Sequence, residues 1–272
     1  MFVKTMYNTL ANQYDTADCF GSITESHKCA LEQIARAHLG ERPHYKILDL
    51  GVGDGAFLSK LKQRMPQADF TGIDVSAEML KRASDSLKLN TIETSAADAS
   101  HFLPPHSQDL ILAHFINAYI PTNILFEQAQ TLAKANGYFS IITTTYESFP
   151  VAQQHLANFI AKGTILSNIV GHYYKAVVKN TPAASGEEEL LKILKQHQFD
   201  VVEHQRLHIP ITLHDIDELA SFGIEGTWFL NTLSVPVLPK TFLLQRIKRM
   251  FEKIFTFPYQ DTHVIDIVLA KK

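Results

Sequence analysis

The sequence predicts an α/β fold in which a doubly wound, mostly parallel sheet has helices on both faces. From residue 44 onward, short apolar strands alternate with amphipathic helices, the pattern of repeated strand–helix–strand units. The first of these strands ends in a turn with three glycines, Gly51, Gly53 and Gly55, and the second ends in a single carboxylate, Asp74. Right-handed crossovers place the carboxyl ends of such strands along one edge of the sheet, where ligands bind.

Local signals justify each element of the alternating region. Pro66 and Gly137 fall where an element must end. Ser76 is a natural N-cap for the helix that carries Met79 and Leu80. The expected strands are 45–50, 69–74, 91–96, 109–115 and 137–144, and the expected helices are 55–65, 77–88 and 122–135.

The flanking segments are predicted from caps and from a break in the pattern. Ser22 and Glu25 have the spacing of a capping box, so we expect a helix that begins there and is closed by Gly40. The alternation stops after Thr145, and the aromatic, mixed segments that follow are expected to be insertions. The remaining expected elements are a helix at 186–197 and a long pair of strands at 199–211 and 262–270.

Composition excludes several classes of protein. The 272 residues are 46% hydrophobic and 19% charged, which is ordinary for a globular domain. The net charge of −3 gives no chain-wide attraction to nucleic acid, so no nucleic-acid partner is expected. Cys19 and Cys29 have no C-x-x-C spacing, and no secretory signal or apolar run of membrane-spanning length is found. We therefore expect a cytoplasmic protein, without a required metal and with no indication of its oligomeric state.

The glycine turn and Asp74 predict a site for a nucleotide-type cofactor. Glycines allow the backbone to approach a ligand, and a carboxylate with two acceptor oxygens suits the vicinal diol of a ribose. The turn reads G-x-G-x-G and so departs from the dinucleotide pattern G-x-G-x-x-G. Asp49, two residues before the first glycine, suits a cationic amine better than a pyrophosphate.

Two further motifs connect these features to a family. Asp74-Val-Ser-Ala-Glu-Met-Leu80 has the form D-x-S-x-x-M-L, and Ala11-Asn-Gln-Tyr-Asp15 has the form A-x-x-Y-D. Together with the glycine turn, they resemble the class I S-adenosylmethionine (SAM)-dependent methyltransferases of the small-molecule type. The resemblance covers residues 8–145 well and the remainder in outline. It implies a Rossmann-like sheet of seven strands with an antiparallel last strand, an N-terminal helical lid and helical insertions.

The resemblance also implies a division of one methyltransferase domain, residues 1–272. The lid is 1–43, the SAM-binding core is 44–145, and the last part of the sheet is 183–212 and 261–272. Residues 146–182 and 213–260 are the substrate-side insertions.

By the same resemblance, Gly51 and Gly53 pack against the methionine part of SAM, and Asp74 takes the ribose hydroxyls. Met79 lies near the adenine, Asp98 accepts from its amino group and Ala99 offers a backbone contact. The cofactor-binding residues expected in this way are Tyr14, Asp49, Gly51, Gly53, Asp74, Val75, Met79, Asp98, Ala99 and Ala113.

Methyl transfer from a sulfonium is a single in-line displacement, so the enzyme mainly positions the reactants and excludes water. A general base is needed only when the nucleophile keeps its proton. His114, after the fourth strand, is the expected catalytic residue, as a base or an orienting group, with Asn117 and Tyr119 as weaker candidates. A histidine that is merely hydrogen-bonded at a strand end is an equally good interpretation. The segment lacks the Asn/Asp-Pro-Pro-Tyr motif that holds an amino group of a nucleobase or a glutamine.

The insertions favour a small, lipophilic or carrier-linked metabolite as substrate. They are rich in aromatic residues, which predict an apolar pocket or simply a core of the insertions' own. Residues 240–253 contain five basic residues and one acidic residue, and 240–254 have one apolar helix face, so peripheral membrane contact is one expectation. Docking of an acidic carrier protein or of an anionic substrate is a second, and an ordinary surface helix is a third. The aromatic residues are Phe149, Phe159, Tyr173, Tyr174, Phe222, Trp228 and Phe229.

The sequence therefore predicts a SAM-dependent methyltransferase (EC 2.1.1.-) that releases S-adenosyl-L-homocysteine. One alternative is an NAD(P)-dependent oxidoreductase, because Asp74 also suits the ribose of NAD; the turn spacing and the lack of a recognisable Tyr-x-x-x-Lys pair count against it. The other alternative is a methyltransferase fold that binds SAM without catalysis.

Overall fold

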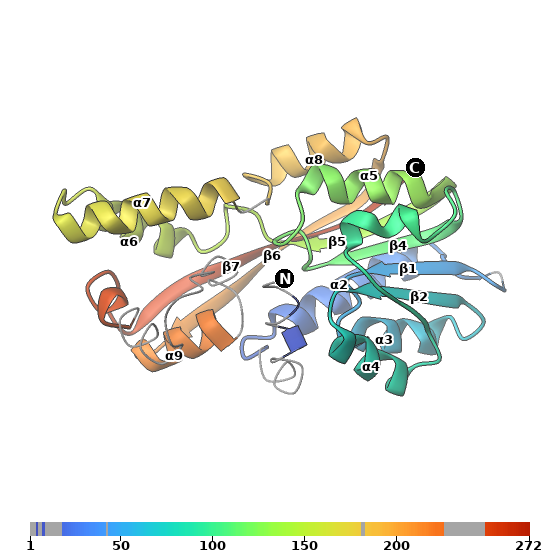
Figure 1. Ribbon diagram of the computed structural model, residues 1–272, viewed down its shortest axis with the longest axis horizontal. Coiled ribbons are helices and arrows are strands. Elements are labelled where there is room, and N and C mark those ends of the chain that lie inside the picture. The colour runs from blue at the N-terminus through green and yellow to red at the C-terminus, as the bar shows by residue number, and fades with distance from the viewer. Residues whose placement is uncertain (1–3, 5–6, 9–17, 42, 181–182, 226–247) are drawn as a thin grey trace.

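The computed structural model describes residues 4, 7–8, 18–41, 43–180, 183–225 and 248–272. Its centre is one seven-stranded sheet with the order β3-β2-β1-β4-β5-β7-β6 (Figure 1). Strands β1 to β5 pair in parallel, whereas β7 runs antiparallel to both β5 and β6. The predicted fold class is confirmed. The strands are β1 (Lys46–Leu50), β2 (Asp69–Asp74), β3 (Asn90–Glu93), β4 (Gln108–His114), β5 (Ala133–Thr143), β6 (Asp200–Leu213) and β7 (Tyr259–Lys271).

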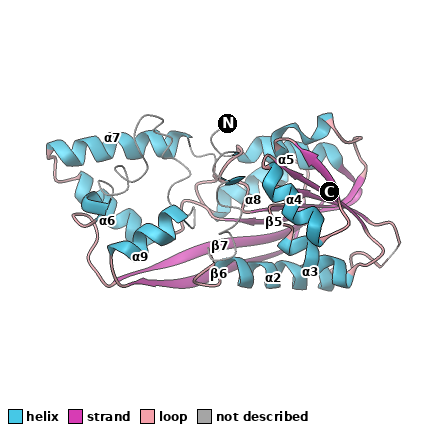
Figure 2. Cartoon of the chain, turned by 60° about the horizontal axis from the view of Figure 1, so that its bottom comes forward, coloured by secondary structure: helices cyan, strands magenta, loops and turns pink. Residues whose placement is uncertain are grey.

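Helices cover both faces of the sheet (Figure 2). Because a central parallel strand is buried on both sides, its successive side chains enter different cores. In β1, Ile47 packs with one helical layer and Leu48 and Leu50 pack with the other. The first layer is α2 (Ser22–Arg36), α3 (Ala56–Arg64) and α4 (Ala77–Ser86); the second is α5 (Thr122–Leu132), α8 (Glu187–Gln196) and the 3-10 helix η2 (Ala96–His101).

Several predicted element ends differ from the structure. The helix expected at 122–135 ends at Leu132, and the strand expected from residue 262 begins at Tyr259. The third strand was expected to reach residue 96 but ends at Glu93, so that the loop at the sheet edge begins with Thr94. The fifth strand was expected to begin at Gly137 but begins at Ala133. Asn136 has a φ of 64°, and the pairing of β4 with β5 shifts register. Asn136 and Gly137 therefore form an irregularity within β5 and do not mark its start.

The two predicted helix caps have different outcomes. Ser76 caps α4 as expected, because its side chain accepts a hydrogen bond from the backbone N–H of Met79. The capping box at Ser22 is wrong. The N-cap of α2 is Gly21, and the carboxylate of Asp18 accepts from the N–H groups of the first turn. The hydroxyl of Ser22 instead bonds Nδ1 of His263 at 2.8 Å.

Strands β6 and β7 extend past the rest of the sheet as a two-stranded ribbon. β5 pairs only with residues 266–271 of β7, whereas β6 pairs with β7 along the whole length of both strands. The outer part of the ribbon carries the insertions as α6 (Pro150–Ile160), α7 (Ile165–Asn180), α9 (Ile216–Ala220) and the π-helical turn η3 (Ser221–Glu225) (Figure 1). A third apolar core lies there, made of Phe149, Ile211, Leu213, Leu219, Phe222 and Tyr259.

This third core bears on the expected aromatic pocket. Phe149 and Phe222 belong to the core, and their rings pack edge to face at 6.0 Å. These two rings therefore serve the insertions' own packing, the simpler of the two interpretations. Trp228 and Phe229 lie outside the described residues.

A buried ion pair links the two strands of the ribbon, and its arginine also reaches the second helical layer. Asp266 of β7 is fully buried and accepts two hydrogen bonds of 2.9 Å from Arg206 of β6. It also accepts one from Nε2 of His204, and the guanidinium reaches on to Glu147 and to Glu187 of α8. Burial alone would raise the pKa of Asp266, but the bonds from His204 and Arg206 hold it below the ordinary value.

We expect Asp266→Asn to lower the free energy of unfolding by about 3 kcal/mol, because it leaves a partly buried guanidinium without its main counter-charge. Urea unfolding at pH 7 followed by circular dichroism measures the change. The control is Glu203→Gln, which removes an exposed partner of Arg36 and should leave the midpoint unchanged. Equal midpoints for the two variants would contradict a stabilising role for the buried pair.

Candidate functional site

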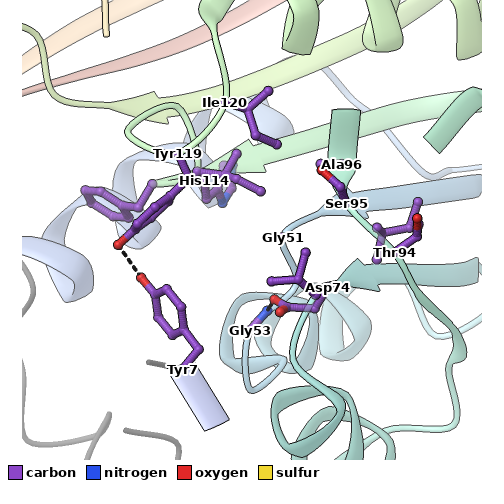
Figure 3. A pocket seen from close by; sticks show the side chains of 14 residues that line it. Tyr7, Gly51, Gly53, Asp74, Thr94, Ser95, Ala96, His114, Tyr119 and Ile120 are labelled. Atoms are coloured by element: carbon purple, nitrogen blue, oxygen red, sulfur yellow. Dashed lines mark hydrogen bonds between the residues drawn. The ribbon is translucent and has the colours of Figure 1, made fainter. Parts of the chain in front are cut away.

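One pocket opens at the carboxyl ends of the parallel strands (Figure 3). The turn after β1, the end of β2, the loop after β3 and the segment after β4 all contribute to its wall, as the topology of an open α/β sheet predicts. The lining residues are Tyr7, Gly51, Gly53, Ile73, Asp74, Val75, Thr94, Ser95, Ala96, His114, Phe115, Ile116, Tyr119 and Ile120.

The glycine turn forms one wall of the pocket, and at Gly51 there is no room for a side chain. Gly51 has a φ of 90°, and a Cβ on it would lie 2.4 Å from Cδ1 of Ile116. A Cβ on Gly53 would meet no atom within 4 Å, so this residue faces open space. The N–H groups of Gly51 and Val52 donate to the carbonyl of Ile73, which ties the turn to β2. The turn thus presents bare backbone to a ligand.

Asp74 ends β2 and holds the turn and the next helix together. Its Oδ2 accepts from the N–H of Gly53 at 3.0 Å, and its Oδ1 accepts from the N–H of Ser76 at 2.8 Å. Burial raises the pKa of Asp74, and these backbone bonds oppose the rise. A carboxylate has about four acceptor directions, so capacity for a vicinal diol is left.

Asp49 is a buried acid close to this turn. Its side chain is 3% exposed, and its Oδ1 has no hydrogen-bond partner among the described residues. Burial and the charge of Asp74 raise the pKa of Asp49 to about 8. Asp49 is not part of the pocket wall. An uncompensated acid behind the glycine turn fits a ligand that carries positive charge.

The opposite wall differs from the expectation. Thr94, Ser95 and Ala96 line the pocket, whereas Asp98 is exposed and Ala99 is buried in the second-layer core. Since β3 ends at Glu93, the residues at the pocket come earlier in the chain than a longer strand would place them. The adenine contacts expected of Asp98 and Ala99 stay predictions.

The other expected cofactor residues fall into two groups. Val75 lies on the pocket wall next to Asp74. Met79 and Ala113 are buried in the cores, with 0% and 1% exposure, and do not line the pocket. Tyr14 lies outside the described residues.

His114 reaches the pocket from the end of β4 but is mostly enclosed. Its Nε2 is 3.1 Å from Oγ of Ser140, and its ring packs edge-on against Phe57 at 4.3 Å. Its Nδ1 has no partner among the described residues. Burial, followed by the nearby His27, lowers the pKa of His114 well below the ordinary value. The imidazole is therefore neutral near pH 7, and the lowered pKa also makes it a weak proton acceptor.

The sequence did not identify Tyr7 as a site residue. Its hydroxyl lies 2.6 Å from that of Tyr119, so this pair closes one side of the pocket (Figure 3). Neighbouring residues anchor the segment, since Lys4 pairs with Glu93 and Asn8 accepts from the hydroxyl of Ser76. The pairing joins residues 112 apart in the chain, and no local pattern signals it.

Tyr119 and Asn117, the weaker candidates, are placed differently. Tyr119 lines the pocket. Asn117 is 1% exposed and does not line it, and both polar atoms of its amide have no partner among the described residues.

A family model described as a methyltransferase domain matches residues 41–198, which is more than half of the chain. The chain belongs to this family. The membership confirms the resemblance to class I SAM-dependent methyltransferases, with S-adenosylmethionine as the cofactor, and removes the case for an NAD(P)-dependent oxidoreductase.

Similarity to curated methyltransferases covers part of each protein. The chain is 35% identical to trans-aconitate 2-methyltransferase of Afipia carboxidovorans over 29% of this chain and 30% of the relative. It is 32% identical to the enzyme of that name from Escherichia coli O7:K1 over 43% of this chain and 45% of the relative. The chain thus spans less than half the length of these relatives.

Solved structures share the fold at low identity. The YcgJ protein of Bacillus subtilis has a TM-score of 0.58 at 14% identity, covering 90% of this methyltransferase-family chain and 98% of its own. The [4+2]-cyclase SpnF has a TM-score of 0.55 at 14% identity, and the match covers 90% of this chain and 80% of SpnF. The fold therefore does not fix the reaction.

Within the described residues, no helix is long and apolar enough to cross a membrane. The same part of the chain holds no group of three or more His, Cys, Asp and Glu side chains arranged to bind a metal.

The raised pKa of Asp49 predicts how stability depends on pH. Between pH 4 and pH 8 the folded protein keeps a proton that the unfolded chain releases, so this residue makes the cofactor-free protein less stable as pH rises. Asp49→Asn removes that contribution. We expect wild type to lose about 3 kcal/mol relative to the variant between pH 5.5 and pH 8.

Urea unfolding at the two pH values, without cofactor, measures this difference. Asp85→Asn, at an exposed position on α4, is the control and should follow the wild type. Parallel pH dependences of wild type and Asp49→Asn would show that Asp49 is ionised at the lower pH already.

Proposed function

We propose that this protein is a SAM-dependent methyltransferase whose acceptor is a small, lipophilic or carrier-linked metabolite. The observation that carries the proposal is the carboxylate of Asp74, which binds the glycine turn and the start of α4 at the edge of an open pocket. Family membership supplies the cofactor, whose bound sulfonium provides an electrophilic methyl group.

The chain's own residues mainly position the reactants. Gly51 and Gly53 offer backbone contact, and Asp74 offers acceptors for the ribose hydroxyls. The partly enclosed wall formed by Tyr7 and Tyr119 helps to exclude water. His114 supplies a neutral imidazole near the acceptor side, able to take a proton from an acceptor that still carries one.

The pocket wall supports an apolar acceptor. Phe115, Ile116, Tyr119 and Ile120 form the side next to His114. None of the fourteen described lining residues is a lysine or an arginine. Recognition of a polycarboxylate ordinarily uses such cations, because their charge-assisted hydrogen bonds offset the loss of water from the anion.

A second candidate is methylation of trans-aconitate. It is favoured by the names of the curated relatives, which are 34–35% identical over 29–36% of this chain. The absence of a cation from the described pocket wall weighs against it. A fold that binds SAM without turnover is the remaining alternative.

The free thiols and the net charge support proposals about the location and the partners of the protein. Cys19 and Cys29 are both free, in keeping with a reducing, cytoplasmic location. The net charge of −3 supports small-molecule partners over nucleic acid.

Calorimetric titration tests the cofactor role. We expect micromolar binding of SAM and S-adenosylhomocysteine, no binding of NADH, and at least about a tenfold loss of affinity in Asp74→Ala, which removes the diol acceptor. The control is Asp69→Asn, which alters an exposed acid at the opposite end of the same strand β2 and should retain affinity. Failure of the folded wild type to bind SAM or S-adenosylhomocysteine would overturn the proposal.

Formation of S-adenosylhomocysteine over a panel of acceptors tests the substrate. We expect a higher kcat/KM for alkylated phenols, quinols and long-chain acids than for trans-aconitate and other short polycarboxylates. Preference for trans-aconitate would establish the second candidate instead, and no turnover with any acceptor would favour the silent fold.

For an acceptor that must lose a proton, His114→Phe should lower kcat about a hundredfold while SAM affinity is unchanged. Ser140→Ala keeps the imidazole and serves as its control. An unchanged kcat in His114→Phe would leave His114 a packing residue.

A further inference from the structure

We propose that the α6–α7 hairpin docks the protein onto an anionic lipid surface. The hairpin projects from the outer end of the β6–β7 ribbon, away from the main sheet (Figure 1). Of the seven large apolar side chains that are exposed among the described residues, four belong to it: Val151, Ile165, Leu166 and Ile169. The inference does not depend on the reaction that the pocket performs.

The exposed apolar residues share one side of α7. At about 100° per residue, Ile165, Leu166 and Ile169 fall within one sector of the helix, with exposed fractions of 84%, 36% and 61%. On the opposite side, Ser167 is fully buried and a Cβ on Gly171 would lie 3.0 Å from Ile160 of α6. Packing with α6 is therefore complete without the outward residues.

The charge of the hairpin complements an anionic surface. From Ser148 to Gly186 the sequence contains no aspartate or glutamate and three lysines, although the whole chain has a net charge of −3. Lys162 and Lys175 are exposed, as is His172 between the apolar sector and Lys175. Each cation near an anionic leaflet strengthens binding about fivefold, and inserted apolar side chains add the rest.

The shape of the hairpin favours lipid over a second protein. Three outward side chains on one projecting helix bury far less than the roughly 800 Å² per partner of a stable protein interface. A fluid headgroup layer accepts such a tip without a matching surface.

The expected contact through 240–254 is a weaker route. Residues 240–247 lie outside the described part of the chain. In the described remainder, Phe251 packs against the third core and Lys248 pairs with Asp217, so these two residues are engaged within the protein.

Sedimentation with vesicles tests the proposal on the full chain. The vesicles are phosphatidylcholine alone or with about 30 mol % phosphatidylglycerol. We expect at least about fivefold more bound protein on the anionic vesicles, falling towards the level on phosphatidylcholine alone in about 0.5 M NaCl. Equal binding to both vesicles, or to neither, would overturn the proposal.

Matched variants locate the surface. Ile165→Ser with Ile169→Ser should lower the partition coefficient about tenfold or more, and Lys162→Glu with Lys175→Glu should abolish the preference for anionic vesicles. The control, Val201→Ser with Val202→Ser, removes exposed apolar side chains from β6 and should bind as wild type does. Thermal unfolding confirms that each variant is folded.

Two outcomes would overturn the assignment of the hairpin. Binding of the hairpin variants at the wild-type level would place the lipid contact elsewhere on the chain. A lipid-free dimer that Ile165→Ser with Ile169→Ser converts to monomer in sedimentation equilibrium would make a second copy the occupant of this face.

Discussion

The carboxylate of Asp74 is the interaction on which the site depends. One oxygen accepts the N–H of Gly53 and the other accepts the N–H of Ser76, so the turn after β1 and the start of α4 are fixed relative to each other. The turn can lie close to the segment after β4 only because Gly51 has no Cβ and so leaves room for Ile116. A single strand-end acid thus fixes the glycine turn relative to the start of α4, while its unused acceptor directions remain for a ligand.

The site also contains polar groups that folding alone leaves uncompensated. Asp49 is a buried acid with an unpartnered oxygen, and His114 is a neutral histidine with an unpartnered nitrogen among the described residues. Burying such groups costs free energy unless a partner arrives. Asp49 lies behind the glycine turn and His114 lies at the end of β4. A site for a charged ligand and a proton-bearing acceptor requires polar groups at such places.

The β6–β7 ribbon divides the molecule into a conventional sheet and an outlying helical region. A buried ion pair of Asp266 with Arg206 links the two strands of the ribbon, and Arg206 also pairs with Glu187 of α8. Beyond this point the strands carry a core of their own. Phe149 and Phe222 are buried in that core, so their rings contribute to packing. The apolar surface still open to a partner lies farther out, on α7.

The sequence by itself determined the features that depend on neighbours in the chain. Alternating strands and helices, the glycine turn, Asp74 and the Ser76 cap predicted the sheet, the edge where ligands bind and the family. Tertiary structure decided the features that join distant segments. Ser22 does not cap its helix because His263 takes its hydroxyl, and Tyr7 enters the pocket wall because Tyr119 meets it there. Such pairings depend on where the fold places two remote side chains, and local spacing contains no information about that.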